Sequence, residues 1–306
     1  MDVVKIAVNP HWYSKFWIGQ FWQLYKLNEI KLRPLVTKMN PPYCFYFEVN
    51  GRPCLVDVSD HKTVYDNPAK YFAYFKANYS SEMSYPRNVY KAICGTTLTK
   101  RNIPLHDNER VFDIVWLAGI SGGRPHKAAM FEALASLPLK MKLAAKMVGE
   151  DDYPRWGKRL ERVGVEAWRD NLSYIKWLEW NKKARWCAMA RGKHDCLSFR
   201  MVDYCSIKVG VLADYSPTSE WAVPIKENVN YLSFGFSGPQ TNDLTEKEVD
   251  RLRGEYKEKA WALLPRIRDD NLRQKVAANN YDYFCTNVKN GQSARDVMKI
   301  ISSIVS

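Results

Sequence analysis

The first hundred residues alternate between short apolar runs and amphipathic stretches. Residues 3–8 are rich in β-branched side chains and end near an Asn-Pro pair, which predicts a strand followed by a turn. Residues 18–26 place apolar side chains at helical spacing, so a first strand and helix are expected here. Residues 67–79 are dense in aromatic side chains and fit either a strand or a helix.

A β-hairpin is the clearest local prediction in this part of the chain. Two apolar runs, residues 43–49 and 53–58, flank Asn50-Gly51, a pair that strongly favours a two-residue hairpin turn. The second of these predicted strands ends in an acidic loop. Loops held by a rigid scaffold often carry catalytic side chains.

A second α/β unit begins near residue 111. Residues 111–118 form a continuous apolar run, which predicts a buried strand, and residues 128–137 have strong helix propensity. The glycine-rich turn between them matches neither a Walker sequence nor the dinucleotide pattern Gly-x-Gly-x-x-Gly. Backbone N–H groups of such a turn can still bind phosphate. The turn residues expected to contact phosphate are Gly119, Ser121, Gly122 and Arg124.

Residues 185–235 combine a strand, a basic loop, a helix and a second strand. Residues 186–190 are apolar, residues 191–195 form a basic loop that contains glycine, and residues 209–213 predict the next buried strand. Ser198 is expected to open the intervening helix, whose first N–H groups would be free to meet an anion. This order of elements predicts a loop-and-helix anion site.

Four side chains of this segment are candidates for binding a nucleotide diphosphate. Arg200 offers a guanidinium fork for phosphate, and Asp203, one turn further on, can accept hydrogen bonds from ribose hydroxyls. Arg191 and Ser198 would add donors from the loop and the helix start. The alternative for Arg200 and Asp203 is an ordinary ion pair on a helix surface. The glycine-bearing loop and the buried strands around the helix favour binding.

The pattern Ser198-x-Arg200-x-x-Asp203 resembles the Ser-x-Arg-x-x-Glu helix of GT-B-type glycosyltransferases, in particular the exostosin-like and lipopolysaccharide-type enzymes. This chain has Asp in the Glu position, and its turn at residues 206–210 differs from the small-residue, glycine and proline run of those enzymes. The resemblance is clearest over residues 111–235. It implies an α/β fold with two Rossmann-like domains that face a cleft and a C-terminal helix that returns to the N-terminal domain.

The same resemblance implies a domain organisation and a reaction. Residues 1–108 would form the acceptor-side domain, joined by a helix within residues 286–306, and residues 109–285 would bind the donor. The implied activity is inverting transfer of a sugar from a nucleotide sugar, a UDP-sugar, to a hydroxyl of an oligosaccharide or glycan. Large DNA viruses of algae encode transferases of this style, including xylose-transferring ones, so UDP-xylose, glycoprotein glycans and a viral source belong to the expectation.

The acidic loop after the hairpin is the best source of a catalytic base. Asp57, Asp60 and His61 lie where a strand is predicted to end, and a carboxylate or imidazole there could remove the proton of the attacking hydroxyl. The alternative is structural, because Asp-x-Ser-Asp is also favourable turn chemistry.

Size, charge and hydropathy limit the remaining classes. With 306 residues and 46% hydrophobic residues, the chain is long enough for two folded domains. No apolar run reaches the ~20 residues of a membrane helix, and the N-terminus lacks signal-peptide character, so we expect no transmembrane segment and a cytoplasmic location. The net charge of +13, with 11 Trp and 18 Tyr, keeps a nucleic-acid-binding protein as the rival class. A third alternative is an inactive scaffold that binds the donor without turnover.

Cysteine and carboxylate spacing argue against metals and disulfides. Seven cysteines, mostly inside apolar runs, suit buried free thiols. His194, Cys196 and Cys205 lack the paired Cys-x-x-Cys spacing of structural zinc sites. No Asp-x-Asp triplet occurs, and that triplet holds the metal in GT-A transferases, so we expect no required cofactor or metal and diphosphate charge met by arginines and backbone donors.

Overall fold

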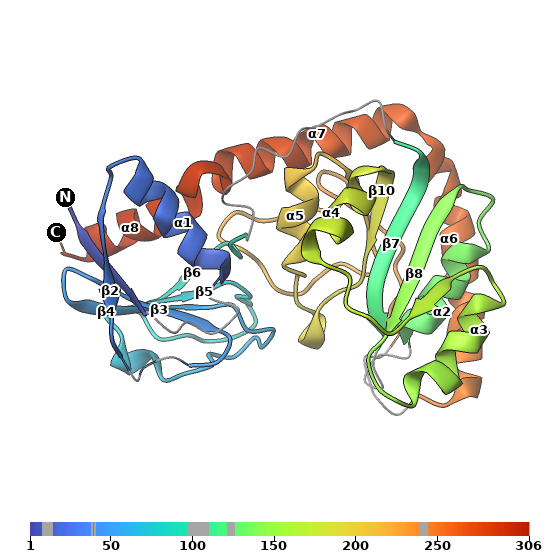
Figure 1. Cartoon of the computed structure of the whole chain (residues 1–306), viewed down its shortest axis with the longest axis horizontal. Coiled ribbons are helices and arrows are strands. Elements are labelled where there is room, and N and C mark those ends of the chain that lie inside the picture. The colour runs from blue at the N-terminus through green and yellow to red at the C-terminus, as the bar shows by residue number, and fades with distance from the viewer. Residues whose placement is uncertain are drawn as a thin grey trace.

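The computed structural model has two α/β domains linked by a long helix (Figure 1). It describes residues 1–7, 15–37, 39, 41–96, 110–120, 126–238 and 244–305. Each domain is built on a six-stranded sheet, and helix α7 runs along one side of the molecule from the C-terminal domain to the N-terminal one. The predicted α/β class and the C-terminal helix that returns to the N-terminal domain are confirmed.

The N-terminal sheet has the strand order β2-β1-β3-β4-β5-β6. Its strands are β1 (Val3–Ala7), β2 (Lys31–Leu35), β3 (Cys44–Val49), β4 (Arg52–Asp57), β5 (Ala73–Lys76) and β6 (Val89–Lys91). Helix α1 (Lys15–Lys26) covers one face, where the Phe21 ring lies 5.6 Å from Phe45 and 4.9 Å from Phe47. The aromatic segment that fitted two structures contains the strand β5 and the short 3₁₀ helix η2 (Pro68–Lys70).

The N-terminal sheet departs from the parallel sheet of a Rossmann domain. The pairs β1–β3 and β3–β4 are antiparallel, whereas β1–β2, β4–β5 and β5–β6 are parallel. The predicted hairpin is the reason for the β3–β4 pair, because a two-residue turn can join only antiparallel strands. Asn50 and Gly51 have φ values of 51° and 81°, the left-handed pair that such a turn requires.

The C-terminal sheet is wholly parallel, with the order β12-β11-β10-β7-β8-β9. Its strands are β7 (Phe112–Ile120), β8 (Met141–Met147), β9 (Glu166–Trp168), β10 (Ala184–Met189), β11 (Gly210–Ala213) and β12 (Leu232–Ser233). The chain therefore adds strands on one side of β7 and then crosses to the other side at β10, which is the arrangement of a doubly wound dinucleotide-binding fold.

Helices cover both faces of the parallel sheet, so its strands are apolar on both sides. Along β7, Ile114 and Trp116 lie in the core beneath α2 and α6, whereas Val115 and Leu117 lie in the core beneath α4 and α5. The covering helices are α2 (His126–Ala135), α3 (Lys158–Glu161), α4 (Tyr174–Lys182), α5 (Arg200–Ser206) and α6 (Glu246–Arg268). Short helical turns are η4 (Tyr153–Gly157), η5 (Lys193–Asp195) and η6 (Lys289–Gly291).

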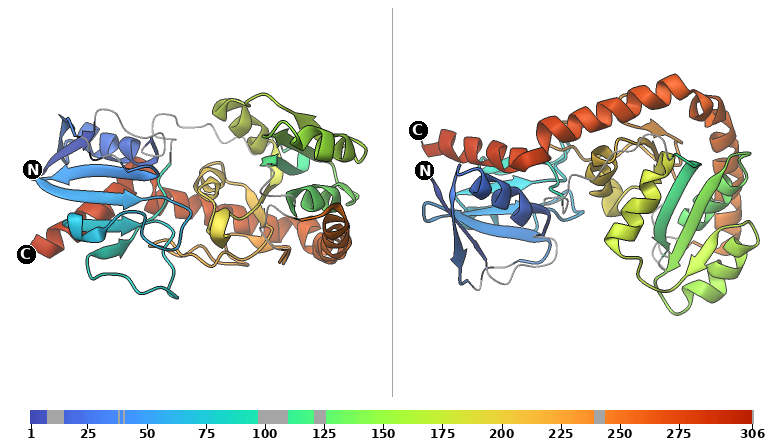
Figure 2. Two further views of the ribbon diagram at one scale, coloured as in Figure 1. Left: turned by 90° about the horizontal axis from the view of Figure 1, so that it is seen from below. Right: turned by 45° about the horizontal axis from the view of Figure 1, so that its top comes forward.

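The chain ends in two helices that tie the domains together, α7 (Asp270–Asn287) and α8 (Gln292–Val305). Helix α7 packs on α5 and β11, and α8 packs on α1 (Figure 2). Arg295 of α8 pairs with Glu29, which follows α1, at 2.6 Å. Helix α7 was not predicted. None of the helices in the described ranges is long and apolar enough to cross a bilayer.

All seven cysteines lie among the described residues and none forms a disulfide. Six are buried, and burial raises the pKa of the thiols of Cys44, Cys94 and Cys187. The prediction of buried free thiols is confirmed.

Candidate functional site

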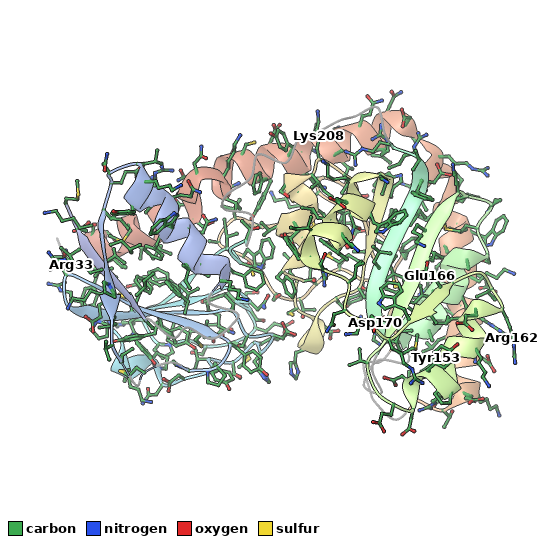
Figure 3. The ribbon with its side chains drawn as sticks, in the orientation of Figure 1. Arg33, Tyr153, Arg162, Glu166, Asp170 and Lys208 are labelled. Carbon is green, nitrogen blue, oxygen red and sulfur yellow. The ribbon has the colours of Figure 1, made fainter. Side chains whose placement is uncertain are left out.

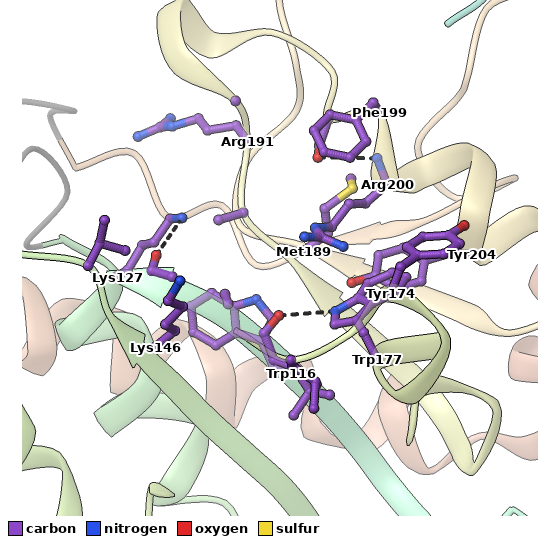
Figure 4. A pocket seen from close by; sticks show the side chains of 18 of the residues that line it. Trp116, Lys127, Lys146, Tyr174, Trp177, Met189, Arg191, Phe199, Arg200 and Tyr204 are labelled. Atoms are coloured by element: carbon purple, nitrogen blue, oxygen red, sulfur yellow. Dashed lines mark hydrogen bonds between the residues drawn. The ribbon is translucent and has the colours of Figure 1, made fainter. Parts of the chain in front are cut away.

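A cavity of about 570 Å³ opens at the carboxyl ends of β7, β8 and β10 (Figure 4). It lies at the point where the strand order reverses between β7 and β10, which is where ligands bind in open parallel sheets. Almost all of its lining comes from the C-terminal domain, and Asp60 is the contribution of the N-terminal domain among the described residues.

Four cationic side chains line this cavity, and Asp60 is the one carboxylate among the described residues of the lining. The cations are Lys127, Lys146, Arg191 and Arg200. Lys127 Nζ donates to the Gly119 carbonyl at 3.1 Å, and Lys146 Nζ donates to Asn171 Oδ1. An excess of positive charge in a cavity favours an anionic ligand.

Of the four cations, Arg200 has the charged group with the fewest polar partners among the described residues. It is the first residue of α5, and its Cζ lies 4.2 Å from the Trp177 ring centroid and 5.4 Å from that of Phe199. No carboxylate of the described residues lies within ion-pairing distance of it. Aromatic contacts fix the plane of the guanidinium and leave its N–H donors available to a ligand (Figure 4).

Arg191 is largely engaged by its own surroundings. Its backbone N–H donates to Asp214 Oδ1 at 2.8 Å, its Nε lies 3.2 Å from Asp195 Oδ1, and its Nη2 donates to the Gly238 carbonyl. Burial raises the pKa of Asp214 to about 6, and the Arg191 charge opposes that rise. Arg191 therefore holds the loop after β10 in shape as well as facing the cavity.

The expected anion site at the start of the helix is not formed as predicted. Helix α5 begins at Arg200, and Ser198 Oγ accepts from the Arg200 N–H at 3.4 Å. The next two amides, of Met201 and Val202, donate to the carbonyls of Ser198 and Phe199 at 3.0 and 3.2 Å. Ser198 lines the cavity, but the first amides of this seven-residue helix are used within its own first turn.

Asp203 does not line the cavity. It is 1% exposed, and its Oδ1 accepts from Tyr174 Oη at 2.8 Å and from Thr96 Oγ1 at 3.3 Å. Burial raises its pKa to about 6, although the Tyr174 hydrogen bond and the Arg200 charge oppose the rise. The expected contact of Asp203 with ribose is therefore corrected, because the carboxylate holds the cavity residue Tyr174 instead.

The three candidates for the catalytic base lie in different surroundings. Asp57 is 0% exposed and pairs with Lys76 at 3.1 Å, so its predicted catalytic role is corrected to a structural one. Asp60 lines the cavity. His61 is exposed and lies outside the described lining, with its ring 4.5 Å from that of His194.

Gly192, in the basic loop, packs tightly against Cys196 and lies near Asp60. A Cβ at Gly192 would lie 2.3 Å from Cys196 Sγ and 3.7 Å from Asp60 Cγ. Any other residue here would force the Cys196 side chain or the loop that carries Arg191 to shift. Gly119 also lines the cavity, at the end of β7, whereas Ser121, Gly122 and Arg124 lie outside the described residues.

Sequence reasoning missed two lysines and most of the aromatic lining. Lys127 is the second residue of helix α2, just after the glycine-rich turn, and Lys146 interrupts the apolar strand β8 near its end. A lysine is rarely buried without a partner, so a lysine within or beside an apolar element is a sequence signal for a functional position. Aromatic rings of the lining are those of Trp116, Trp168, Tyr174, Trp177, Phe199 and Tyr204.

Among the described residues, no three His, Cys, Asp or Glu side chains are grouped closely enough to hold a metal ion. His194 is exposed, whereas Cys196 and Cys205 are buried, so this trio does not converge on one point. Polar side chains of the described cavity lining include the four cations, Asp60, Asn171 and Ser198.

No protein-family model and no curated protein matches the chain. Among solved structures, HepE from Anabaena in complex with UDP-glucose is 14% identical with a TM-score of 0.42, over 62% of this chain and 48% of that chain. The C-terminal domain of LpcC, a group 1 family glycosyl transferase from Francisella tularensis, is 15% identical with a TM-score of 0.40, over 57% and 85%.

The pneumococcal O-GlcNAc transferase GtfA, in complex with UDP and GlcNAc, is 11% identical with a TM-score of 0.49, over 92% of this chain and 54% of that chain. The matches thus span about half the length of HepE and GtfA. Similarities at this level do not establish a family, so a function has to be inferred from the residues of the cavity.

Proposed function

We propose that this chain is a GT-B-type glycosyltransferase that moves a sugar from a nucleotide donor to a hydroxyl of an oligosaccharide or glycan. The observation that carries the proposal is the cavity at the β7–β10 crossover, with four cations on one domain and Asp60 on the other. A doubly wound sheet binds nucleotides at this point, and the cationic lining suits their phosphates.

In this proposal Arg200 neutralises the departing diphosphate. A guanidinium held over the Trp177 ring can donate two parallel hydrogen bonds to phosphate oxygens. Lys127 and Lys146 would add charge from the neighbouring strand and helix ends, and Gly119 and Arg191 would shape the same wall. Fixed cations can offset the diphosphate charge themselves, which supports a metal-independent reaction.

Asp60 is the proposed catalytic base. The acceptor oxygen forms a bond to the anomeric carbon, the bond from that carbon to the donor phosphate oxygen breaks, and the acceptor proton passes to the Asp60 carboxylate. Asp60 and Arg200 belong to different domains, so base and leaving-group stabiliser flank the cavity from two sides. That arrangement supports a single displacement with inversion at the anomeric carbon.

The donor is proposed to be a UDP-sugar, with UDP-xylose as a specific candidate. The exostosin-like character of the Arg200 segment supports a sugar nucleotide, and the aromatic lining can stack on a base or a sugar ring. Membership of the exostosin-like family, a viral source and a glycoprotein acceptor are finer parts of the same proposal.

The rival class, a nucleic-acid-binding protein, predicts aromatic rings interleaved with basic residues on an open sheet face. Trp17, Trp156, Trp186 and Trp221 are all fully buried, and helices cover both faces of the parallel sheet. Part of the net charge is dispersed, because exposed Arg33 and Arg162 lie at opposite ends of the molecule (Figure 3). These features favour the enzyme.

The test is hydrolysis of a set of UDP- and GDP-sugars by the wild type, Asp60→Asn and His61→Gln. Removing a general base typically costs about 10²–10⁴-fold in turnover, so Asp60→Asn should lose that much kcat while still binding UDP. His61→Gln, in the same loop but outside the described lining, should stay within about threefold of wild type.

Equal turnover by Asp60→Asn and wild type would remove Asp60 as the base, and a loss confined to His61→Gln would move the role to His61. A wild-type protein that neither binds UDP nor hydrolyses any of these donors would contradict the proposed function itself.

A further inference from the structure

Two buried side chains, Asn78 and Ser219, join the two walls of the cavity. Asn78 follows β5 in the N-terminal domain and is 5% exposed, and Ser219 lies after β11 in the C-terminal domain and is 4% exposed. Ser219 Oγ donates to Asn78 Oδ1 at 3.2 Å, which makes a direct hydrogen bond between the domains. A buried polar contact of this kind is strengthened by its low dielectric surroundings.

Each end of this pair is bound to the backbone of one cavity wall. Asn78 Nδ2 donates to the Ser59 carbonyl at 2.9 Å, one residue before Asp60. On the other side, Ser219 Oγ accepts from the Leu197 N–H at 2.9 Å, one residue before Ser198. We call this path from Ser59 through Asn78 and Ser219 to Leu197 the wall bridge.

The hydrogen-bond directions in the wall bridge are fixed by its ends. A backbone N–H can only donate and a carbonyl can only accept. The Leu197 N–H therefore makes the Ser219 oxygen an acceptor, which leaves the Ser219 hydroxyl proton for Asn78 Oδ1. The Asn78 amide must then turn its NH₂ group to the Ser59 carbonyl. One arrangement satisfies all four groups.

The Asp60 side of the bridge is braced from within its own domain. Asp57 Oδ1 accepts from the Ser59 N–H at 2.9 Å, and Lys76 Nζ donates to Ser59 Oγ at 3.2 Å. Ser59 is thus held through its N–H, hydroxyl and carbonyl, and it is 2% exposed. Ser59 precedes Asp60 directly in the chain, so the Asn78 hydrogen bond to the Ser59 carbonyl helps to place the Asp60 backbone.

We propose that Asn78 and Ser219 are positioning residues that set the spacing between Asp60 and the Ser198–Arg200 wall. The expected effect on turnover rests on the proposed function, whereas the link between the two cavity walls rests on the hydrogen bonds alone. Neither residue belongs to the described lining of the cavity, so both act through the residues that they hold. A misplacement of reacting groups by about 1 Å can cost about 10²-fold in rate.

The variants are Asn78→Ala and Ser219→Ala, with Lys91→Ala as the matched control. Lys91 also spans the domain interface, through an ion pair of 2.7 Å with Glu220, but that pair is partly exposed and neither residue belongs to the described lining of the cavity. Hydrogen exchange of the ligand-free proteins is measured at Leu197 and over residues 57–62. Each of the two bridge variants should speed exchange at both places by about tenfold or more, although Asn78 does not contact Leu197.

Steady-state kinetics with the UDP-sugar that is hydrolysed fastest distinguish a positioning role of the bridge residues from a general loss of structure. We expect kcat to fall about 10–100-fold with KM within about threefold, the double variant to be no worse than the poorer single one, and Lys91→Ala to match wild type. Exchange changes confined to the residues that each substitution touches, or additive losses in the double variant, would overturn the proposal.

A parallel fall in melting temperature, nucleotide affinity and turnover would also overturn it, because that is the signature of a merely structural pair. A wild type without donor hydrolysis would instead contradict the proposed function, and the exchange measurement would still decide whether the bridge couples the walls.

Discussion

The two domains hold charged side chains in opposite states. In the N-terminal domain Asp57 and Lys76 are both 0% exposed and pair with each other at 3.1 Å. In the C-terminal domain the Arg200 side chain is partly exposed over Trp177, and no carboxylate of the described residues lies within ion-pairing distance of it. The Asp57–Lys76 pair therefore stabilises the fold, whereas the Arg200 charge is available to a ligand.

The largest expected effect concerns the buried pair. Asp57→Asn should lower the free energy of unfolding by about 3–5 kcal/mol, because Lys76 would be left buried without a counter-charge. The Ser59 and Tyr65 N–H groups and the Tyr74 hydroxyl would also lose a charged acceptor. Chemical denaturation at neutral pH measures the change.

The control for the buried pair is Glu48→Gln, since Glu48 pairs with Lys5 at 3.5 Å on the same sheet with both side chains partly exposed. It should cost less than about 1 kcal/mol. Equal costs at the two positions would show that burial does not distinguish these pairs and would break the comparison between the domains.

The second effect is a pH dependence that originates at Asp203. Its pKa is raised to about 6 by burial, whereas an unfolded Asp titrates near 3.9, so the folded state binds more protons between these values. Stability from this group is therefore greatest below about pH 4 and is lost as pH rises to about 6. Asp203→Asn removes this loss.

Relative to wild type, Asp203→Asn should gain roughly 2–3 kcal/mol between pH 4 and pH 8, measured by denaturation at both values. Asp270→Asn is the opposite control, because hydrogen bonds from Arg273 lower the pKa of Asp270 to about 2. Its relative stability should fall only slightly over the same interval, by less than about 1 kcal/mol, because a carboxylate with a folded pKa of about 2 changes its contribution mainly below pH 4. A pH-independent difference for Asp203→Asn would contradict the buried-acid interpretation.

Local signals in the sequence predicted local structure well. Asn50-Gly51 specified the hairpin because only a left-handed two-residue turn fits there, and the apolar run before Gly119 specified the central strand β7. Helix α7 escaped prediction because its buried positions, including Asn280, are not a simple apolar stripe. Helix α6 runs past Pro265, where proline would ordinarily end a helix.

The candidate site was predicted less completely because its geometry depends on distant partners. Asp57 and Asp60 are three residues apart in one acidic loop, yet Lys76 on the neighbouring strand draws only Asp57 into the core. Similarly, Tyr174 and Thr96 donate hydrogen bonds to Asp203, which is buried beside the cavity lining, whereas Arg200 lines the cavity. Sequence spacing identified residue types suited to phosphate binding and base catalysis, but tertiary contacts determine which of them line the cavity.

The most direct test of the central claim is calorimetric titration of UDP into the wild type and Arg200→Ala. A charge-assisted hydrogen bond to phosphate contributes about 1.5–3 kcal/mol, so the variant should bind UDP about 10–100-fold more weakly with an unchanged melting temperature. Arg162→Ala, an exposed arginine outside the described lining, should bind like wild type. Equal affinity of Arg200→Ala and wild type, or no binding of UDP by the wild type, would contradict the account.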